Sequence, residues 1–174
     1  MLVTLQGLFT PGELDAIEAY GESLMPMKAD SPADQARITR VAWMKRGPEA
    51  EWLHGRIEKT VLEMNSRLYK YDLYGLKESF QYSVYESAEG GHYHWHVDTS
   101  QTVERKLSLT LQLSEPWSYE GGDLILQAGE GTFTANRSRG ALVFFPSYML
   151  HRVTPVTSGI RKSLVVWVAG PPYR

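Results

Sequence analysis

Histidine and carboxylate side chains in two separate stretches of the chain could together bind a metal ion. His96 and Asp98 lie two positions apart in GHYHWHVD, and His151 lies in SYMLHRVTP. On an extended chain, side chains two positions apart point to the same side, so an imidazole and a carboxylate can face one point. A further imidazole from a distant strand would complete the set. These residues are therefore candidate ligands for Fe(II), Mn(II), Zn(II) or Ni(II).

Two histidines and one carboxylate bind one face of an octahedral ion and leave its other positions open. This arrangement is typical of non-haem Fe(II) oxygenases, which use the open positions for substrate and O₂. An HxD triplet alone is a weak signal because so short a motif occurs by chance. His151 alone is also more typical of an ordinary core or surface histidine, so further residues must support the interpretation.

Arg161 supplies that support, because it follows His151 by ten residues and lies where the apolar run SLVVWVAG begins. The segments on either side of VTPVTSG are expected to pair as a hairpin, which would turn both side chains toward one cavity. Arginine binds carboxylates through two parallel hydrogen bonds. The pattern therefore suits a 2-oxo acid whose keto and C1 oxygens bind the metal while Arg161 binds its far carboxylate.

Two more histidines, His92 and His94, lie an even number of positions before His96. On a regular strand they would face the same side as His96, so they are alternative ligands. A cupin-type HxH site would also need a glutamate shortly afterwards, whereas Val-Asp-Thr-Ser follows His96. We therefore expect His92 and His94 at the mouth of the cavity, beside the metal ligands or the substrate, or in solvent.

From residue 79 onward, short runs rich in β-branched and aromatic residues alternate with turn-forming residues, which predicts strands. The predicted strands are FQYSVYE, KLSLTLQLS, DLILQ, GTFTAN, ALVFFPS and SLVVWVAG. In KLSLTLQLS the leucines face one way, while Ser108, Thr110 and Gln112 face the other. One face of this strand therefore packs in the core, and the opposite face meets either water or an inner cavity.

The first third of the chain predicts two helices. Thr10 and Pro11 suit the N-cap and first position of a helix that reaches about Leu24, and a second helix fits Pro48 to about Tyr69. The stretch ARITRVAWM between them fits a strand or an ordered loop. Two helices followed by seven or eight strands predict a mainly β fold, with the helices backing a β-sandwich or a jelly roll.

Composition narrows the class of protein. A length of 174 residues fits one domain, spanning 1–174. The net charge is −2, so we expect no nucleic-acid partner. No apolar run reaches the ~20 residues that a membrane-spanning helix needs, and the N-terminus lacks signal-peptide features. The chain has no cysteine, so neither a disulfide nor a thiolate metal site is possible, and we expect a cytoplasmic protein.

Several of these motifs together resemble the prolyl 4-hydroxylase-like branch of the 2-oxoglutarate/Fe(II)-dependent oxygenases, most closely the PKHD-type hydroxylases. The motifs are HVD, RKLSLTLQLSEP, YEGGDL, GALVFFPS and LHRVTPVTSGIRKSL, within about residues 80 to 170. The resemblance implies a double-stranded β-helix (jelly roll) at about 76–170, with helical support at about 1–75. It also implies Fe(II) bound by His96, Asp98 and His151, with Arg161 on the distal carboxylate of 2-oxoglutarate.

The resemblance extends to residues around the metal. It places Tyr85 near the co-substrate, and Gln112 at a position where some relatives carry an aromatic residue and where glutamine could donate a hydrogen bond. The positions that would border the substrate pocket are Tyr93, Arg105, Trp167 and His94.

The implied activity is hydroxylation of an unactivated C–H bond with Fe(II), 2-oxoglutarate and O₂, releasing succinate and CO₂, with ascorbate as a supporting reductant. The substrate would be a peptidyl residue of the prolyl type, a free amino acid or a small metabolite. One alternative is a cupin-like dioxygenase or isomerase that does not use 2-oxoglutarate. Another is a non-catalytic jelly roll that binds a ligand. The sequence leaves the primary substrate and the oligomeric state open.

Overall fold

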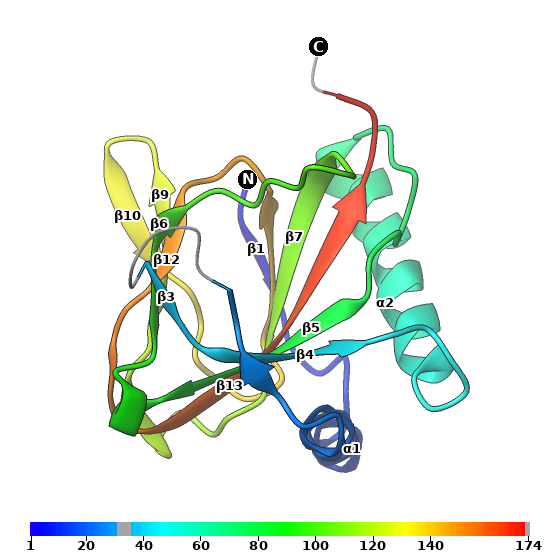
Figure 1. Cartoon of the computed structure of the whole chain (residues 1–174). Coiled ribbons are helices and arrows are strands. Elements are labelled where there is room, and N and C mark those ends of the chain that lie inside the picture. Colours follow the sequence, from blue (N-terminus) through cyan, green and yellow to red (C-terminus); the bar gives the residue numbers. More distant parts are fainter. Residues whose placement is uncertain (31–35, 173–174) are drawn as a thin grey trace.

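The computed structural model describes residues 1–30 and 36–172, which form two antiparallel sheets and two helices (Figure 1). The major sheet is eight-stranded, with the order β1-β11-β7-β13-β5-β4-β2 and with β8 paired to β13. Its strands are β1 Val3–Leu5, β2 Met27–Lys28, β4 Arg40–Met44, β5 Phe80–Glu86, β7 Arg105–Gln112, β8 Tyr119–Gly121, β11 Leu142–Pro146 and β13 Val156–Ala169.

The minor sheet is five-stranded, with the order β10-β9-β12-β6-β3. Its strands are β3 Arg37–Ile38, β6 His92–His96, β9 Leu124–Ala128, β10 Gly131–Thr134 and β12 His151–Val153. From β5 onward the chain passes back and forth between the sheets, since β5, β7, β11 and β13 lie in one and β6, β9 and β12 in the other. This alternation makes the fold a jelly roll, as the resemblance implied.

Both predicted helices are present, and both lie outside the major sheet (Figure 1). Helix α1, Pro11–Ser23, begins at the predicted N-cap: Thr10 and Glu13 form a capping box, in which each side chain binds the other residue's backbone N–H. Helix α2, Glu51–Met64, continues into a π-helical turn, Asn65–Tyr69, and so ends where the periodicity predicted. A short 3₁₀ turn, Ser87–Glu89, separates β5 from β6.

The leucines of β7 join the apolar residues of the helices in the largest buried core. Leu107, Leu109 and Leu111 lie in this cluster with residues such as Ile17 and Ile57. The alternating pattern of β7 therefore has the predicted meaning, and its polar face turns toward the space between the sheets. The N-terminal part of the chain also contributes strands β1 to β4, of which only the ARITRVAWM stretch had a strand pattern.

The predicted hairpin around VTPVTSG is wrong. Strand β12 pairs with β6 and β9, whereas β13 begins at Val156 and pairs with β5, β7 and β8. Both edges of each strand are therefore occupied by other partners. The residues between β12 and β13 cross from the minor sheet to the major sheet, so His151 and Arg161 lie on opposite walls rather than on paired strands.

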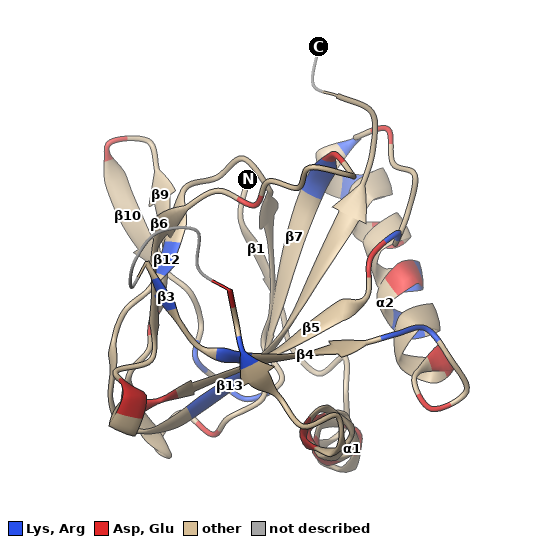
Figure 2. Cartoon of the chain, viewed as in Figure 1, with Lys and Arg blue, Asp and Glu red and all other residues tan. Residues whose placement is uncertain are grey.

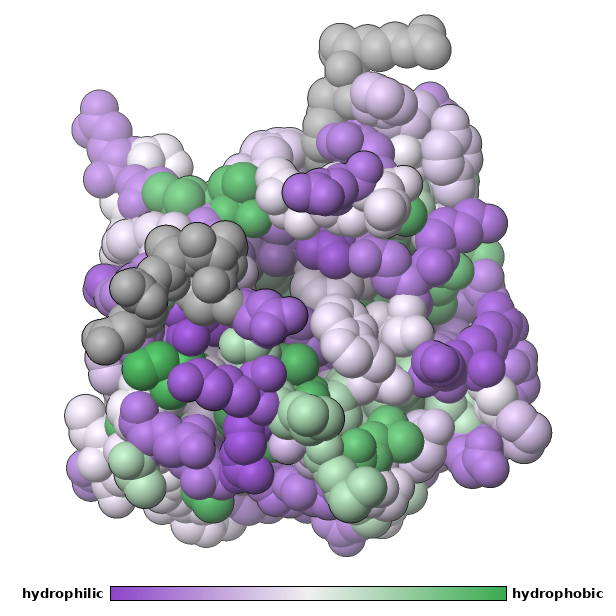
Figure 3. Space-filling view, in the orientation of Figure 1, coloured by the Kyte–Doolittle hydropathy of each residue, from purple (hydrophilic) through white to green (hydrophobic). Residues whose placement is uncertain are grey.

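Charged residues are spread over the molecule, and acidic and basic residues are mixed along α2 and the loops (Figure 2). The space-filling view of the same face shows hydrophobic residues in small groups separated by hydrophilic ones (Figure 3). Within the described residues, no helix combines the length and apolar character needed to cross a bilayer.

Candidate active site

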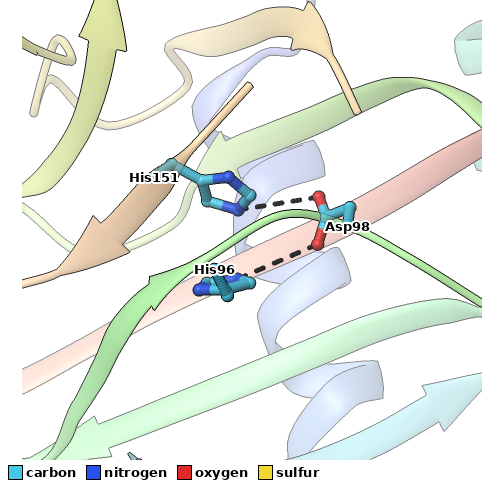
Figure 4. A group of neighbouring side chains, drawn as sticks. All are labelled: His96, Asp98 and His151. Carbon is cyan, nitrogen blue, oxygen red and sulfur yellow. Dashed lines mark ion pairs between the residues drawn. The ribbon is translucent and has the colours of Figure 1, made fainter. Parts of the chain in front are cut away.

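The fold brings His96, Asp98 and His151 together at one end of the minor sheet (Figure 4). His96 ends β6 and His151 begins β12, and the register pairs these two residues directly, with ring centroids 4.2 Å apart. The backbone N–H of Asp98 donates to the carbonyl of Ser147 (2.9 Å), which holds the segment after β6 against the major sheet. One potential ligand atom from each of the three residues lies within 4.8 Å of the others.

Both imidazoles present Nε2 to the Asp98 carboxylate (Figure 4). The distance to a carboxylate oxygen is 3.9 Å from His96 Nε2 and 3.6 Å from His151 Nε2. Each Nδ1 lies within hydrogen-bond distance of a main-chain carbonyl, that of His94 (2.7 Å) and that of Met149 (2.8 Å). An Nδ1–H that donates to a carbonyl leaves the Nε2 lone pair free, which is the form that binds a metal.

Burial, together with the neighbouring His151, lowers the pKa of His96 to about 4. Desolvation disfavours the charged imidazolium, so His96 is neutral at pH 7. A neutral imidazole is the state that a metal requires.

The Asp98 carboxylate is held by a residue that the sequence analysis did not single out as a site residue. Ser108 Oγ donates to Asp98 Oδ2 (2.6 Å) and lies 3.0 Å from Ser147 Oγ. Ser108 is fully buried on the inward face of β7. Its place on the polar face of KLSLTLQLS was the signal that could have identified it.

A cavity of about 330 Å³ lies between the sheets, and the three residues of the triad line it. On the major sheet, alternate residues of β13 face this cavity: Arg161, Ser163, Val165 and Trp167. On the minor sheet, one row of residues in register across four strands faces it: Arg37, Tyr93, Val153 and Leu124. The metal ligands thus come from one sheet and the segment that follows its strand β6, and Arg161 comes from the other sheet.

Arg161 is only 2% exposed, and no described carboxylate forms an ion pair with it. Its Nη2 donates to Gln112 Oε1 (3.0 Å), and its guanidinium carbon lies 5.4 Å from the ring centroid of Tyr85, the residue opposite it on β5. A methyl group at Gly122, where φ is +63°, would come within 3.0 Å of Arg161 Cδ. Tyr85 lines the cavity, whereas Gln112 lies behind Arg161 and contacts the guanidinium.

Three of the four expected substrate positions line the cavity: Tyr93, Arg105 and Trp167. The ring of Tyr93 stacks on His96 at 3.5 Å between centroids. Arg105 donates to both carboxylate oxygens of Glu78 (2.7 and 2.6 Å) and lies 3.7 Å above the ring of Trp167.

His94 differs from these positions, since it is exposed and is absent from the described residues that line the cavity. The reason is a β-bulge in β6. Its partner β12 pairs His151 with His96 but Val153 with Tyr93, so three steps along β6 match two along β12. The bulge therefore turns Tyr93, rather than His94, to the same side as His96, and Tyr93 faces the cavity. The rings of His92 and His94 pack on each other, with their centroids 4.6 Å apart.

The cavity also includes residues that carry no recognisable motif. Arg37, Trp43 and Gln81 line it, from β3, β4 and β5. Their inward orientation depends on pairing between strands that are distant in the sequence, so no local pattern marks them.

Comparison with known proteins decides the family. Residues 80–169 match the family described as the 2OG-Fe(II) oxygenase superfamily, which is more than half of the chain. The protein belongs to this superfamily. The superfamily implies Fe(II) as the metal, with 2-oxoglutarate and O₂ as co-substrates. Two imidazoles and one carboxylate are a donor set that suits Fe(II).

Relatives within this superfamily are named as hydroxylases. A PKHD-type hydroxylase of Bordetella pertussis is 31% identical over 180 residues, covering 97% of this chain and 78% of the relative. One of Psychrobacter sp. is 40% identical over 93 residues, covering 50% of this chain but only 36% of the relative. The chain thus matches little more than a third of some PKHD-type relatives.

A solved structure has the same fold. A prolyl hydroxylase from Trichoplax adhaerens, in complex with a peptide fragment of a hypoxia inducible factor oxygen degradation domain, superposes with a TM-score of 0.79. It is 18% identical, and the alignment covers 97% of this chain and 83% of that one. The likeness supports the jelly-roll fold described above.

Proposed function

We propose that this oxygenase hydroxylates an unactivated C–H bond while converting 2-oxoglutarate to succinate and CO₂. In this proposal His96, Asp98 and His151 hold Fe(II), and Arg161 binds the distal carboxylate of 2-oxoglutarate. The observation that carries the proposal is the buried Arg161, which faces the same cavity as the triad and lacks an acidic partner among the described residues. A buried charge of this kind is stable only when a partner compensates it.

The other residues would have separate roles. Tyr85 and Gln112 fix the plane and direction of the Arg161 guanidinium, which is a condition for binding a carboxylate through two bonds. Ser108 orients the Asp98 carboxylate. Apolar lining residues such as Val165 and Leu124 keep water from the reacting carbon. When bound, the iron and the co-substrate supply the oxidising chemistry.

The substrate would be a peptidyl residue of the prolyl type, a free amino acid or a small metabolite. The names of the PKHD-type relatives support a hydroxylation, and the peptide bound to the structural neighbour supports a cavity that can admit a side chain. Tyr93, Arg105 and Trp167 are the proposed substrate contacts, and His94 is a contact only if the substrate extends beyond the cavity.

The test is succinate formation from 2-oxoglutarate by the purified protein with Fe(II) and ascorbate. We expect slow succinate release without substrate and faster release with a substrate from a panel of amino acids and prolyl peptides. His151→Ala should lose Fe(II) binding, whereas His92→Ala, a matched histidine loss next to the site, should keep it. O₂ consumption without succinate would instead favour a dioxygenase that does not use 2-oxoglutarate.

A further inference from the structure

Arg37 is a cavity residue whose charge has no acidic partner among the described residues. It lies on β3, the edge strand of the minor sheet, opposite Tyr93 on β6, and its guanidinium carbon is 4.8 Å from the centre of the Tyr93 ring. It lines the same cavity as the metal triad. Within the described part of the chain, its buried Nε and Nη2 atoms have no hydrogen-bond partner. Buried donors without a partner are unfavourable, so donors of this kind that line a cavity point to a ligand.

The other arginines of the cavity differ from Arg37. Arg105 is neutralised by Glu78, which accepts two hydrogen bonds from it. Arg161 donates to Gln112 and is already assigned to 2-oxoglutarate by the proposed function. Among the described residues, Arg37 is thus the cavity arginine with no hydrogen-bond or ion-pair partner and no assigned ligand.

The net charge of the cavity also points to Arg37. This count rests on the proposed function, in which the cavity holds Fe(II) and 2-oxoglutarate. The negative charge of Asp98 and the two of 2-oxoglutarate cancel the two charges of Fe(II) and that of Arg161. With Arg105 neutralised by Glu78, the positive charge of Arg37 remains. The buried indole Nε1 of Trp167 is a second unpartnered donor on the cavity wall. A loaded cavity therefore offers a positive charge and a neutral donor, both of which suit an anionic acceptor.

We propose that Arg37 binds a carboxylate of the primary substrate, so that the enzyme acts on compounds carrying a carboxylate close to the hydroxylated carbon. A guanidinium with two free donors can bind both oxygens of a carboxylate, which fixes the orientation of the molecule as well as its charge. The carboxylate can come from a small free acid or from an acidic residue of a peptide. The chemistry at Arg37 is the same for both sources.

The test measures binding without turnover. The protein is loaded with Mn(II) and 2-oxoglutarate without O₂, and ligands are titrated by calorimetry as matched acid and amide pairs. One arm uses free L-proline and L-prolinamide, and the other uses capped prolyl-glutamate and prolyl-glutamine dipeptides. We expect an acid to bind about tenfold or more tightly than its amide in one arm, which also identifies the source of the carboxylate.

Arg37→Gln should abolish this preference while leaving the affinity for 2-oxoglutarate unchanged. Arg152→Gln is the matched control, because Arg152 also has an unpartnered buried Nε and also lies over an aromatic ring, that of Trp95, but is absent from the cavity lining. This control should keep the preference.

Three results would overturn the proposal: no acid preferred over its amide in either arm, a preference that survives Arg37→Gln, or a loss of 2-oxoglutarate binding in that variant. Substrate-free succinate formation by the unaltered protein tests the proposed function separately. An acid preference that depends on Arg37, in a protein that forms no succinate, would refute the proposed function and leave the carboxylate site standing.

Discussion

Arg161→Met tests the anchor of 2-oxoglutarate directly. Methionine keeps much of the length and apolar volume of the arginine stem but removes every donor and the charge. In the unaltered protein, one nitrogen of the guanidinium donates to Gln112, and its other donors have no acceptor on the described side chains. The variant should therefore lose the distal contact of the co-substrate while the metal ligands on the other sheet stay in place.

The expected size of the effect follows from two charge-assisted hydrogen bonds. Each hydrogen bond to a charged group contributes about 1.5–3 kcal/mol, so two contribute about 3–6 kcal/mol. A difference of 1.4 kcal/mol is about tenfold in Kd, so the Kd for 2-oxoglutarate should rise by about 10²–10⁴-fold. Arg161 is only 2% exposed, so bulk water has little access to its position, which favours an effect of this full size.

The measurement is calorimetric titration of 2-oxoglutarate into Mn(II)-loaded protein, with Mn(II) affinity measured in parallel. Arg105→Met is the matched control, because Arg105 lines the same cavity but binds Glu78. It should leave 2-oxoglutarate binding unchanged and lower the free energy of unfolding by about 1–3 kcal/mol, since Glu78 loses its partner. The anchor role is refuted if Arg161→Met binds Mn(II) normally and 2-oxoglutarate within about tenfold of the unaltered protein.

Three further changes test other parts of the structure. Ser108→Ala removes the donor to Asp98, so the Kd for Mn(II) should rise about 10–100-fold with an unchanged circular dichroism spectrum; an unchanged Kd would contradict the orienting role. Burial lowers the pKa of His54 in the folded protein. As the pH falls below about 6.5, this histidine therefore binds a proton in the unfolded chain before it does so in the folded one, and the free energy of unfolding declines. Urea unfolding at pH 7.5 and at pH 5 measures this decline. The free energy of unfolding should fall less between the two pH values in His54→Leu than in the unaltered protein, and an equal fall would count against this cause. Gly21→Ala would bring a methyl group within 2.5 Å of a buried tyrosine ring and should lower the free energy of unfolding by about 1–3 kcal/mol. Gly12→Ala, in open space on the same helix, should not lower it, and equal effects in thermal unfolding would contradict the packing argument.

The two helices and the strands with a clear local pattern were predictable because their signals are local. The alternation in β7 and the N-cap at Thr10 depend on neighbouring residues, and the structure confirms both. Two residues of the candidate triad could also be proposed from a local pattern, because His96 and Asp98 lie within one motif. His151 needed the pairing of β12 with β6 in one register, and no local pattern contains that register.

The errors of prediction have the same origin. The hairpin between β12 and β13 was inferred from a turn-rich segment, but that segment crosses between the sheets because each strand has other partners. The prediction that His94 and His96 face the same side failed because a bulge shifts β6 by one residue. Arg37 had no signal at all, since only the pairing of β3 with Tyr93 turns it toward the cavity.

The division of the site between two sheets has a consequence for its precision. Strand pairing in the minor sheet fixes His151, and strand pairing in the major sheet fixes Arg161. The hydrogen bonds of neither sheet therefore set the distance between His151 and Arg161. That distance depends on side chains packed between the sheets, where Tyr85 of β5 and Val153 of β12 belong to one buried cluster. Close-packed interiors transmit changes in volume as displacements. Repacking this cluster would therefore move the arginine relative to the metal ligands while both sheets stay intact, and 2-oxoglutarate affinity would change more than metal affinity.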